Sequence, residues 1–192
     1  MKERPILFSA PMVRAILEGT KTQTRRIIKL PSMYEIEERD YGYWPWRYDA
    51  ETNGDDWAKC PYGQIGDQLW VRETFCPIYP QDPTYNNGRP IEFDYMATYE
   101  YGYRMSDLIG EKKKWKPSIH MPRRASRIQL EITGIKVERL HDIGQGGACA
   151  EGRPIGFDPL DWYRDQWESI NGIHSWDANP WVWVIEFRRI EQ

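Results

Sequence analysis

The sequence lacks any long hydrophobic run, and this excludes a membrane-spanning helix. Such a helix needs about 20 consecutive apolar residues, and no segment of the 192-residue chain approaches that length. The first residues, MKERPILFSAP, also lack the apolar core of a secretory signal. We therefore expect a cytoplasmic protein with no membrane partner.

Cysteine and histidine are scarce, and their spacing excludes the common disulfide and metal patterns. The three cysteines, Cys60, Cys76 and Cys149, lie far apart, and the three histidines are equally scattered. An odd number of widely spaced cysteines gives neither a disulfide framework nor a CxxC site. No HExxH motif is present. The sequence predicts no metal site and no cofactor.

The chain also lacks an overall positive charge, so nucleic acid would have to be bound by a local patch. The net charge is −3 and the isoelectric point is about 5.7. The segment KKKWKPSIHMPRRASR nevertheless holds seven Lys and Arg residues and no acid. Cations supply affinity for phosphate, and an indole supplies a face on which a base can stack. RNA or single-stranded nucleic acid is one expected partner, and a solvated basic loop is the equal alternative. The residues assigned to binding are Lys113, Lys114, Trp115, Arg123 and Arg124.

Aromatic residues are abundant, with 10 Trp and 12 Tyr, and many lie in two segments without a regular period. These segments are residues 31–62 and 76–117. Because so many aromatic side chains need burial or a partner, we expect two ordered insertions that cover the core or its cleft. The chain is otherwise expected to form one domain, residues 1–192.

The remaining periodicity favours strands. In SRIQLEITGIKVERL, Ile128, Leu130 and Ile132 share one face, and the apolar parity slips by one at Gly134, which predicts a bulge. Short helices are expected over residues 9–19, after Asp142 as a cap, and after Asp158 as a cap. The predicted class is mainly β with short helices (α+β), as a small bent β-barrel with helices packed outside. An open α+β sheet is the alternative.

The octapeptide GTKTQTRR, residues 19–26, combines three threonines with three basic residues. Lys21 and Thr24 can converge if Lys21 lies in a turn and Thr24 starts a strand. A lysine whose pKa is lowered by burial can serve as base for a hydroxyl, and a carboxylate would have to protonate the leaving group. The alternative is a helix cap followed by a basic strand edge. Neither residue is expected in the apolar core.

Three arginines are further candidates for binding phosphate or a nucleobase carbonyl. Because adjacent residues of a strand point to opposite faces, at most one of Arg25 and Arg26 should face a shared cleft, and Arg26 is favoured because it shares parity with Thr24. Surface ion pairs are the alternative for both. Arg72 is a weaker candidate, since pairing at the edge of the core is the better interpretation.

Four segments together resemble an ASCH-domain protein of the PUA-like superfamily. They are PILFSAPMVRAILEGTKTQTRR, GDQLWVRETF, IHMPRRASRIQLEITGIKVERLHDI and NPWVWVIEFRRI. The resemblance lies in a short helix followed by Gly-x-Lys-x-x-Thr and a basic residue, and in a Gly-Asp turn that leads into a strand. The longer, phage- or prophage-associated members are the most similar type.

The resemblance implies a PUA-like β-barrel with a cleft beside the Gly-x-Lys loop, and binding of RNA or nucleotides. Some small members are amidohydrolases on N4-acetylcytidine, so a modified nucleoside is a further expected ligand, and others are ribonucleases. In the amidohydrolases a lysine is the base, a threonine the nucleophile and a glutamate the proton donor. By motif, these roles fall on Lys21, Thr24 and, in the Ala-Glu context of ACAEG, Glu151. We expect binding first, with amide hydrolysis and then RNA cleavage as alternatives.

Overall fold

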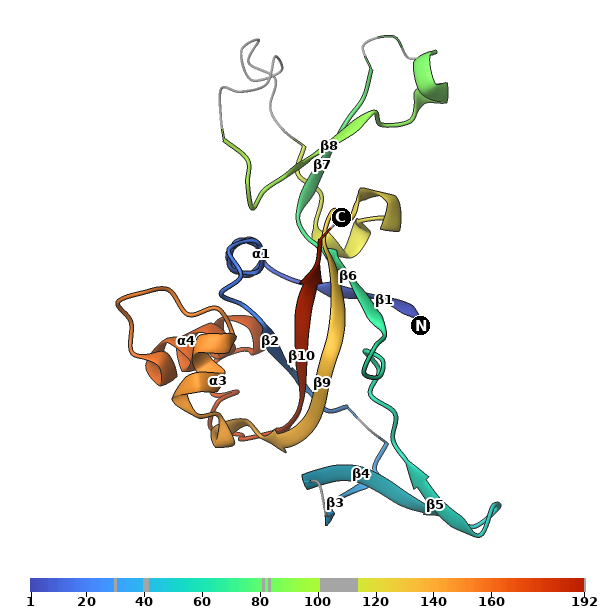
Figure 1. The fold of residues 1–192 in the computed structure, drawn as a ribbon, viewed down its shortest axis with the longest axis vertical. Coiled ribbons are helices and arrows are strands. Elements are labelled where there is room, and N and C mark those ends of the chain that lie inside the picture. Colours follow the sequence, from blue (N-terminus) through green and yellow to red (C-terminus); the bar gives the residue numbers. More distant parts are fainter. Residues whose placement is uncertain (30, 40–41, 81, 83, 101–113, 192) are drawn as a thin grey trace.

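The computed structural model describes residues 1–29, 31–39, 42–80, 82, 84–100 and 114–191. Its centre is a sheet in which strands from distant parts of the chain lie side by side (Figure 1). The strand order is β1-β6-β9-β10-β2, and β1 pairs with β6 in parallel while the other neighbours are antiparallel. These strands are β1 (Glu3–Leu7), β2 (Gln23–Ile27), β6 (Gln68–Arg72), β9 (Gln129–Arg139) and β10 (Trp181–Ile190).

The predicted class, mainly β with short helices, is confirmed. The pairing found in the described residues runs as an open path, with β1 at one end and β2 at the other. The strand β2 is therefore an edge strand of this sheet, and its outer edge is where the candidate site lies. The bulge predicted at Gly134 is confirmed, because the β9–β10 register shifts between Glu186 and Phe187, opposite this glycine.

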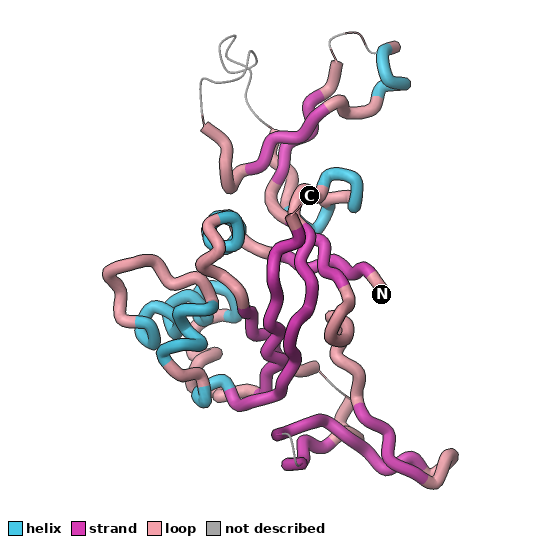
Figure 2. Tube along the Cα trace, in the orientation of Figure 1, coloured by secondary structure: helices cyan, strands magenta, loops and turns pink. Residues whose placement is uncertain are grey.

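The three α-helices lie on one side of the sheet, as Figure 2 shows. They are α1 (Ala10–Leu17), α3 (Gln145–Ala150) and α4 (Pro159–Asn171). Single 3-10 turns lie elsewhere along the chain, at Tyr85–Gly88, Ser118–His120, Arg123–Ala125 and Leu140–Asp142. Asp158 caps α4 as predicted, since its carboxylate accepts from the N–H groups of Leu160 and Asp161. The capping role predicted for Asp142 in α3 is wrong. Gly144 precedes that helix, and Asp142 instead accepts from the N–H of Arg139.

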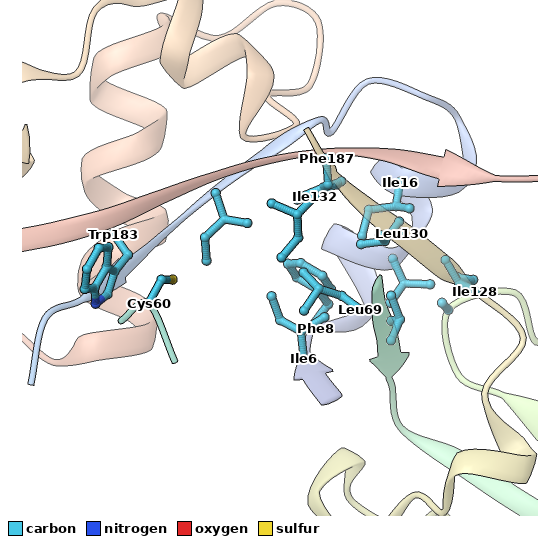
Figure 3. Close-up of a cluster of buried hydrophobic side chains, with 14 of the residues drawn as sticks. Ile6, Phe8, Ile16, Cys60, Leu69, Ile128, Leu130, Ile132, Trp183 and Phe187 are labelled. Atoms are coloured by element: carbon cyan, nitrogen blue, oxygen red, sulfur yellow. The ribbon is translucent and has the colours of Figure 1, made fainter. Parts of the chain in front are cut away.

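The two faces of β10 pack into two apolar clusters, because successive side chains of a strand alternate between its faces. Trp183, Ile185 and Phe187 belong to the main cluster, with the side chains of β1, β6, β9 and α1. Figure 3 shows most of these side chains gathered between the strands, with Trp183 and Cys60 toward one end. Val182 and Val184 point the other way, onto α3 and α4.

The first aromatic segment forms three strands, β3 (Glu35–Arg39), β4 (Gly42–Asp49) and β5 (Gly54–Trp57), which project from one end of the sheet (Figure 1). Trp44 anchors them to the main cluster through its ring contact with Trp183, at 5.1 Å between centroids. The second segment contains the hairpin of β7 (Phe75–Ile78) and β8 (Glu92–Tyr95) at the opposite end. Neither strands β3–β5 nor the β7–β8 hairpin contributes a residue to the cavities of the candidate site described below.

Two sequence exclusions have a structural counterpart. No helix of the described residues is long and apolar enough to cross a membrane. Cys60 and Cys76 are buried as free thiols, and Cys149 is exposed.

Candidate functional site

The site begins with a backbone bridge between two segments 130 residues apart in sequence. Gly19 ends α1 with a φ of 77°, and the chain then turns so that Lys21 lies just before β2. Lys21 and Glu151 form an isolated antiparallel bridge, and the N–H of Thr22 donates to the carbonyl of Ala150 at 2.9 Å. Glu151 ends α3, so the position of that short helix sets the position of the carboxylate.

The ammonium group of Lys21 is buried and fully bonded. The residue is 2% exposed, and its Nζ donates to the carbonyl oxygens of Gln23 and Glu151, both at 2.9 Å. A third bond joins Nζ to Oε2 of Glu151 at 2.5 Å. These three acceptors use all three N–H groups of an ammonium ion. Lys21 is not a member of the apolar clusters of the described residues, but the turn points its side chain inward, so that it is buried among polar partners.

Arg25 extends this ion pair into a chain of alternating charge. Its Nη1 lies 3.3 Å from Oε1 of Glu151, and its Nη2 lies 2.8 Å from Oε1 of Glu138. The same Nη1 donates to the side-chain oxygen of Gln23. Since Arg25 is 5% exposed, two carboxylates compensate its charge inside the protein.

Burial lowers the pKa of Lys21 below the 10.5 of an ordinary lysine, because loss of water disfavours the ammonium form. Glu151 acts in the opposite direction, and the charges of Arg26 and Arg25 lower the pKa further. Burial also raises the pKa of Tyr163, which packs against Arg25, so this phenol stays neutral. A buried lysine with a lowered pKa and one specific carboxylate partner is typical of a functional site.

Thr24 opens onto a small cavity at the free edge of β2. This small cavity has a volume of about 60 Å³, and its lining includes Thr24, Arg25, Glu151 and Tyr163. Thr24 itself is buried, at 2% exposed, and this cavity is the space that adjoins the residue. None of the hydrogen bonds found in the described part of the chain joins Lys21 to Thr24, since the ammonium group is directed at Glu151.

A large cavity of about 440 Å³ adjoins the small one. Helix α1 forms one wall, and the loop after Glu151 together with α4 forms the other. Met12, Glu151 and Gln166 line both cavities and so form the boundary between them. Glu151 is therefore a residue shared by a small space lined by Thr24 and a larger one.

Arg25 and Arg26 point to opposite faces of β2, as the parity argument predicts, since Arg25 lies over the ring of Tyr163 and Arg26 lies toward Phe8. Both residues nevertheless contribute to the lining of the small cavity, which lies at the free edge of β2. Arg26 lies over the ring of Phe8, and its Nη2 donates to the carbonyl of Leu7 at 2.7 Å. Arg25, which was not favoured, is the one that contacts Glu151.

Arg72 lies away from this site. Its Nε donates to the carbonyl of Ser118 at 3.0 Å, and its guanidinium lies over the ring of Trp70. It therefore holds the 3-10 turn at Ser118–His120 against β6, which agrees with the structural alternative for this residue.

Two of the predicted binding residues in the basic segment, Arg123 and Trp115, make contacts within the protein. Arg123 pairs with Glu3 at 2.8 Å, and Trp115 makes an edge contact with Tyr99 at 5.2 Å between ring centroids. Lys114 and Arg124 are exposed, and Lys113 lies outside the described residues. This segment follows the β7–β8 hairpin and is not part of the cavity walls.

Several site residues were not found from the sequence. Glu138 is an isolated acid near the end of β9, and only the β9–β10–β2 pairing brings it to Arg25. Tyr163 and Trp167 of α4 also line the small cavity, and the sequence predicted that helix without a link to the site. No group of three or more His, Cys, Asp or Glu within the described ranges is arranged to hold a metal ion.

Comparisons with known proteins add little to this geometry. No family model and no curated protein matches the sequence. Among solved structures, the chain is similar to an ASCH domain from Lactobacillus crispatus JV V101, with 12% identity and a TM-score of 0.44. The match covers 98% of this chain and 79% of that chain. A likeness of this degree carries no argument about activity, so the account of the site depends on its own residues.

Proposed function

We propose that this protein hydrolyses an amide bond of an acylated heterocyclic amine, with N4-acylated cytidine as the model substrate. The observation that supports this most is the buried Lys21–Glu151 pair at the cavity that holds Thr24. Burying such a pair costs several kcal/mol for each ion in desolvation, which attraction only partly offsets. A site of this kind is better explained by chemistry than by stability.

The pair can supply a base and an acid from one shared proton. Transfer of that proton from Nζ to Oε2, along a contact of 2.5 Å, converts the ion pair into a neutral amine and a neutral carboxylic acid. The burial that lowers the pKa of Lys21 favours loss of this proton from Nζ. The neutral amine has a free lone pair, which a rotation of the side chain can direct at Thr24.

In the first half of the reaction, Lys21 takes the proton of the Thr24 hydroxyl as Oγ1 attacks the acyl carbon. The carbon–nitrogen bond breaks, and the carboxylic acid of Glu151 gives its proton to the departing nitrogen. The products are the free amine and an ester on Thr24. The pair is left as an ammonium ion and a carboxylate.

In the second half, the carboxylate of Glu151 takes a proton from water, and the resulting hydroxide attacks the ester. Oγ1 of Thr24 leaves and takes a proton from the ammonium group of Lys21. The acid is released, and the amine and carboxylic acid of the pair are restored. The sum is one amide and one water converted into one acid and one amine.

The test is release of cytidine from N4-acetylcytidine by matched threonine variants. Thr24→Ala should abolish turnover, and Thr24→Ser should retain part of it, because serine keeps the hydroxyl. Thr22→Ala is the control, since Thr22 is an exposed threonine of the same motif. Lys21→Arg should also be inactive, because arginine does not deprotonate. Turnover that survives Thr24→Ala, in protein shown to be folded by its melting curve, contradicts the proposal.

A second candidate function is binding of RNA or single-stranded nucleic acid by the basic segment. The observation that favours it is the exposure of Lys114, Lys116 and Arg124 within a short stretch. Charge reversal of Lys114 and Arg124 should weaken RNA binding and flatten its dependence on salt. Reversal of Lys29 and Lys59, which are exposed elsewhere, is the control with the same change in charge. Equal loss in both double variants, or no RNA binding by the wild type at low salt, contradicts this role.

A further inference from the structure

The two adjoining cavities suggest how the substrate is divided at the scissile bond. We propose that the small cavity accepts the acyl group and limits it to about the size of acetyl, while the large cavity binds the planar heterocyclic amine. This inference rests on the proposed hydrolase function and adds its specificity. It assigns selectivity to Ile170 and Trp162, two residues of α4 that carry no part of the proton transfers.

The small cavity is restrictive because of its volume and its walls. Its volume is about 60 Å³, against about 440 Å³ for the large cavity. Ile27, Trp167 and Ile170 make apolar parts of its lining. A methyl group bonded to a carbonyl fills such a space, whereas a longer chain or a ring must displace a wall. Protein interiors are close-packed, so that displacement is unfavourable.

The large cavity suits a ring of nucleobase size. Its volume of about 440 Å³ falls within the range of small-molecule sites, roughly 300–1,000 Å³. Trp162, Pro154 and Ile155 give it apolar surfaces, while Arg14 and Glu18 give it charged groups of both signs. Trp162 is partly exposed, so a planar ring can stack on its indole.

Glu151 fixes the direction of the substrate. Because Glu151 lines both cavities, an acyl group in one and an amine in the other would be joined beside this residue. In this orientation the proton donor serves the leaving nitrogen, and Thr24 attacks the acyl carbon. The reverse orientation would place the ring in the smaller of the two cavities.

The experiment compares N4-acetyl-, N4-propionyl-, N4-butyryl- and N4-benzoylcytidine, which share one amine. For the wild type we expect kcat/KM to fall roughly tenfold or more for each added methylene, and further for benzoyl. Ile170→Ala should raise the ratio of butyryl to acetyl kcat/KM by about tenfold. Ile170 is 51% exposed, so the protein should still fold. Ile173→Ala is the matched control, because Ile173 is 81% exposed and lies outside both cavities.

Trp162→Ala tests the amine side separately. It should raise KM for acetylcytidine roughly tenfold and weaken binding of the product cytidine by a similar factor, as expected for loss of one stacking contact. The preference for acyl length should stay as in the wild type. Cytidine binding is measured by calorimetry and needs no turnover.

The outcomes separate the two proposals. Equal kcat/KM for acetyl and benzoyl substrates, in an enzyme that still depends on Thr24, overturns the division of the substrate and leaves the hydrolase standing. A change in acyl preference caused by Trp162→Ala, without a change in cytidine binding, overturns it as well. If no acylated cytidine is turned over, both proposals fail. Cytidine binding that depends on Trp162 would then show the large cavity to be a nucleoside site without hydrolysis.

Discussion

At the scale of the residue, Lys21 is the most informative side chain of the protein. Its side chain is fully buried beside a carboxylate that comes from the other end of the sequence. Such a pair contributes little net stability, yet it becomes strongly destabilising when one partner is removed, because a lone charge remains buried. A buried ion pair therefore differs from an apolar contact in its response to mutation, because loss of one partner costs more stability than replacement of both.

Removal of one partner of the Lys21–Glu151 pair should therefore lower the free energy of unfolding more than removal of both partners. We expect Glu151→Gln to lower the free energy of unfolding by roughly 3–5 kcal/mol, because the Lys21 ammonium loses its compensating charge. The double variant Lys21→Met, Glu151→Leu should recover most of this loss and remain inactive. Urea denaturation measures both. A double variant less stable than Glu151→Gln would show that the pair itself stabilises the fold.

The pH dependence of kcat/KM should report the shared proton of the pair. In the wild type the active form holds that proton, so activity falls as the pH rises through the pKa of Lys21, which burial places below 10.5. In Glu151→Gln, with p-nitrophenyl acetate as a substrate that needs no acid, only the neutral amine is active. Activity of that variant should therefore rise with pH, through a pKa of Lys21 lower than in the wild type, because Glu151 raises that pKa. Parallel profiles for the two proteins would contradict the assignment of base and acid.

The residues of the site differ in how far the sequence reveals them. Lys21 and Thr24 stand in a motif in which charge and hydroxyl groups are concentrated without apolar neighbours. Glu151 was assigned by resemblance, and the structure brings it to Lys21. Glu138 could not be found, because its contact with Arg25 depends on strand register across β10. Arg26 shares the face of Thr24 as expected, while the contact of Arg25 with Glu151 depends on the position of α3 on the other face and has no signal in the parity of β2.

At the scale of the element, the turn before β6 shows how one carboxylate holds two segments together. Asp67 accepts hydrogen bonds from the N–H of Lys2 at 2.7 Å and from Arg4 at 3.0 Å, which joins the turn to β1. Gly63 approaches this carboxylate closely, and a Cβ there would lie 3.0 Å from its Oδ2. Its φ of 128° also favours glycine.

Asp67→Asn should lower stability in a pH-dependent way. The pKa of Asp67 lies below 3.8, although burial acts to raise it. The hydrogen bond from the backbone N–H of Lys2 lowers it most, and those from the N–H of Gln64 and the side chain of Arg4 lower it further. A depressed pKa in the folded state stabilises the protein above the unfolded value, and this contribution is lost as the pH falls through the folded value. The difference in unfolding free energy from wild type should therefore be largest at neutral pH and vanish in acid. A difference independent of pH would contradict the role of the charge.

The elements were predictable where a local signal exists. The cap at Asp158, the face shared by Ile128, Leu130 and Ile132, and the bulge at Gly134 all depend on residues close in sequence. The cap at Asp142 was misplaced because the following glycines leave the start of α3 to tertiary contacts. The packing of α3 and α4 beside β2, which builds the cavities, has no local signal.

At the scale of the whole molecule, strands β3–β5 and the β7–β8 hairpin extend a sheet that carries the site at its β2 edge. The class was predictable because alternating apolar residues dominate the sequence, while the strand order was not. Parallel pairing of β1 with β6, across about 60 intervening residues, follows from the packing of both strands in the main cluster. The aromatic insertions were expected to cover the core. Among the described residues of β3–β5, Ile36 and Trp44 pack on the main cluster.

The attachment of strands β3–β5 to the main cluster should depend on Trp44. Its indole N–H donates to the carbonyl of Ala58 at 2.9 Å, and its ring contacts Trp183. Limited proteolysis should spare residues 31–62 in the wild type, and Trp44→Ala should make them susceptible while the rest stays intact. Tyr48→Ala, at a residue 58% exposed, is the control and should change little. Rapid cleavage of the wild-type segment would show it to be loosely attached.

The central claim is that Thr24 becomes acylated beside the Lys21–Glu151 pair. The most direct measurement is peptide mass spectrometry of Glu151→Gln after reaction with p-nitrophenyl acetate. Acylation then needs no acid, and removal of the acyl group lacks its base, so the ester should accumulate. We expect one acetyl group on the peptide that contains Thr24, and none there in Glu151→Gln, Thr24→Ala. Release of nitrophenol at the same rate from both proteins, with Thr24 unmodified, would contradict the account.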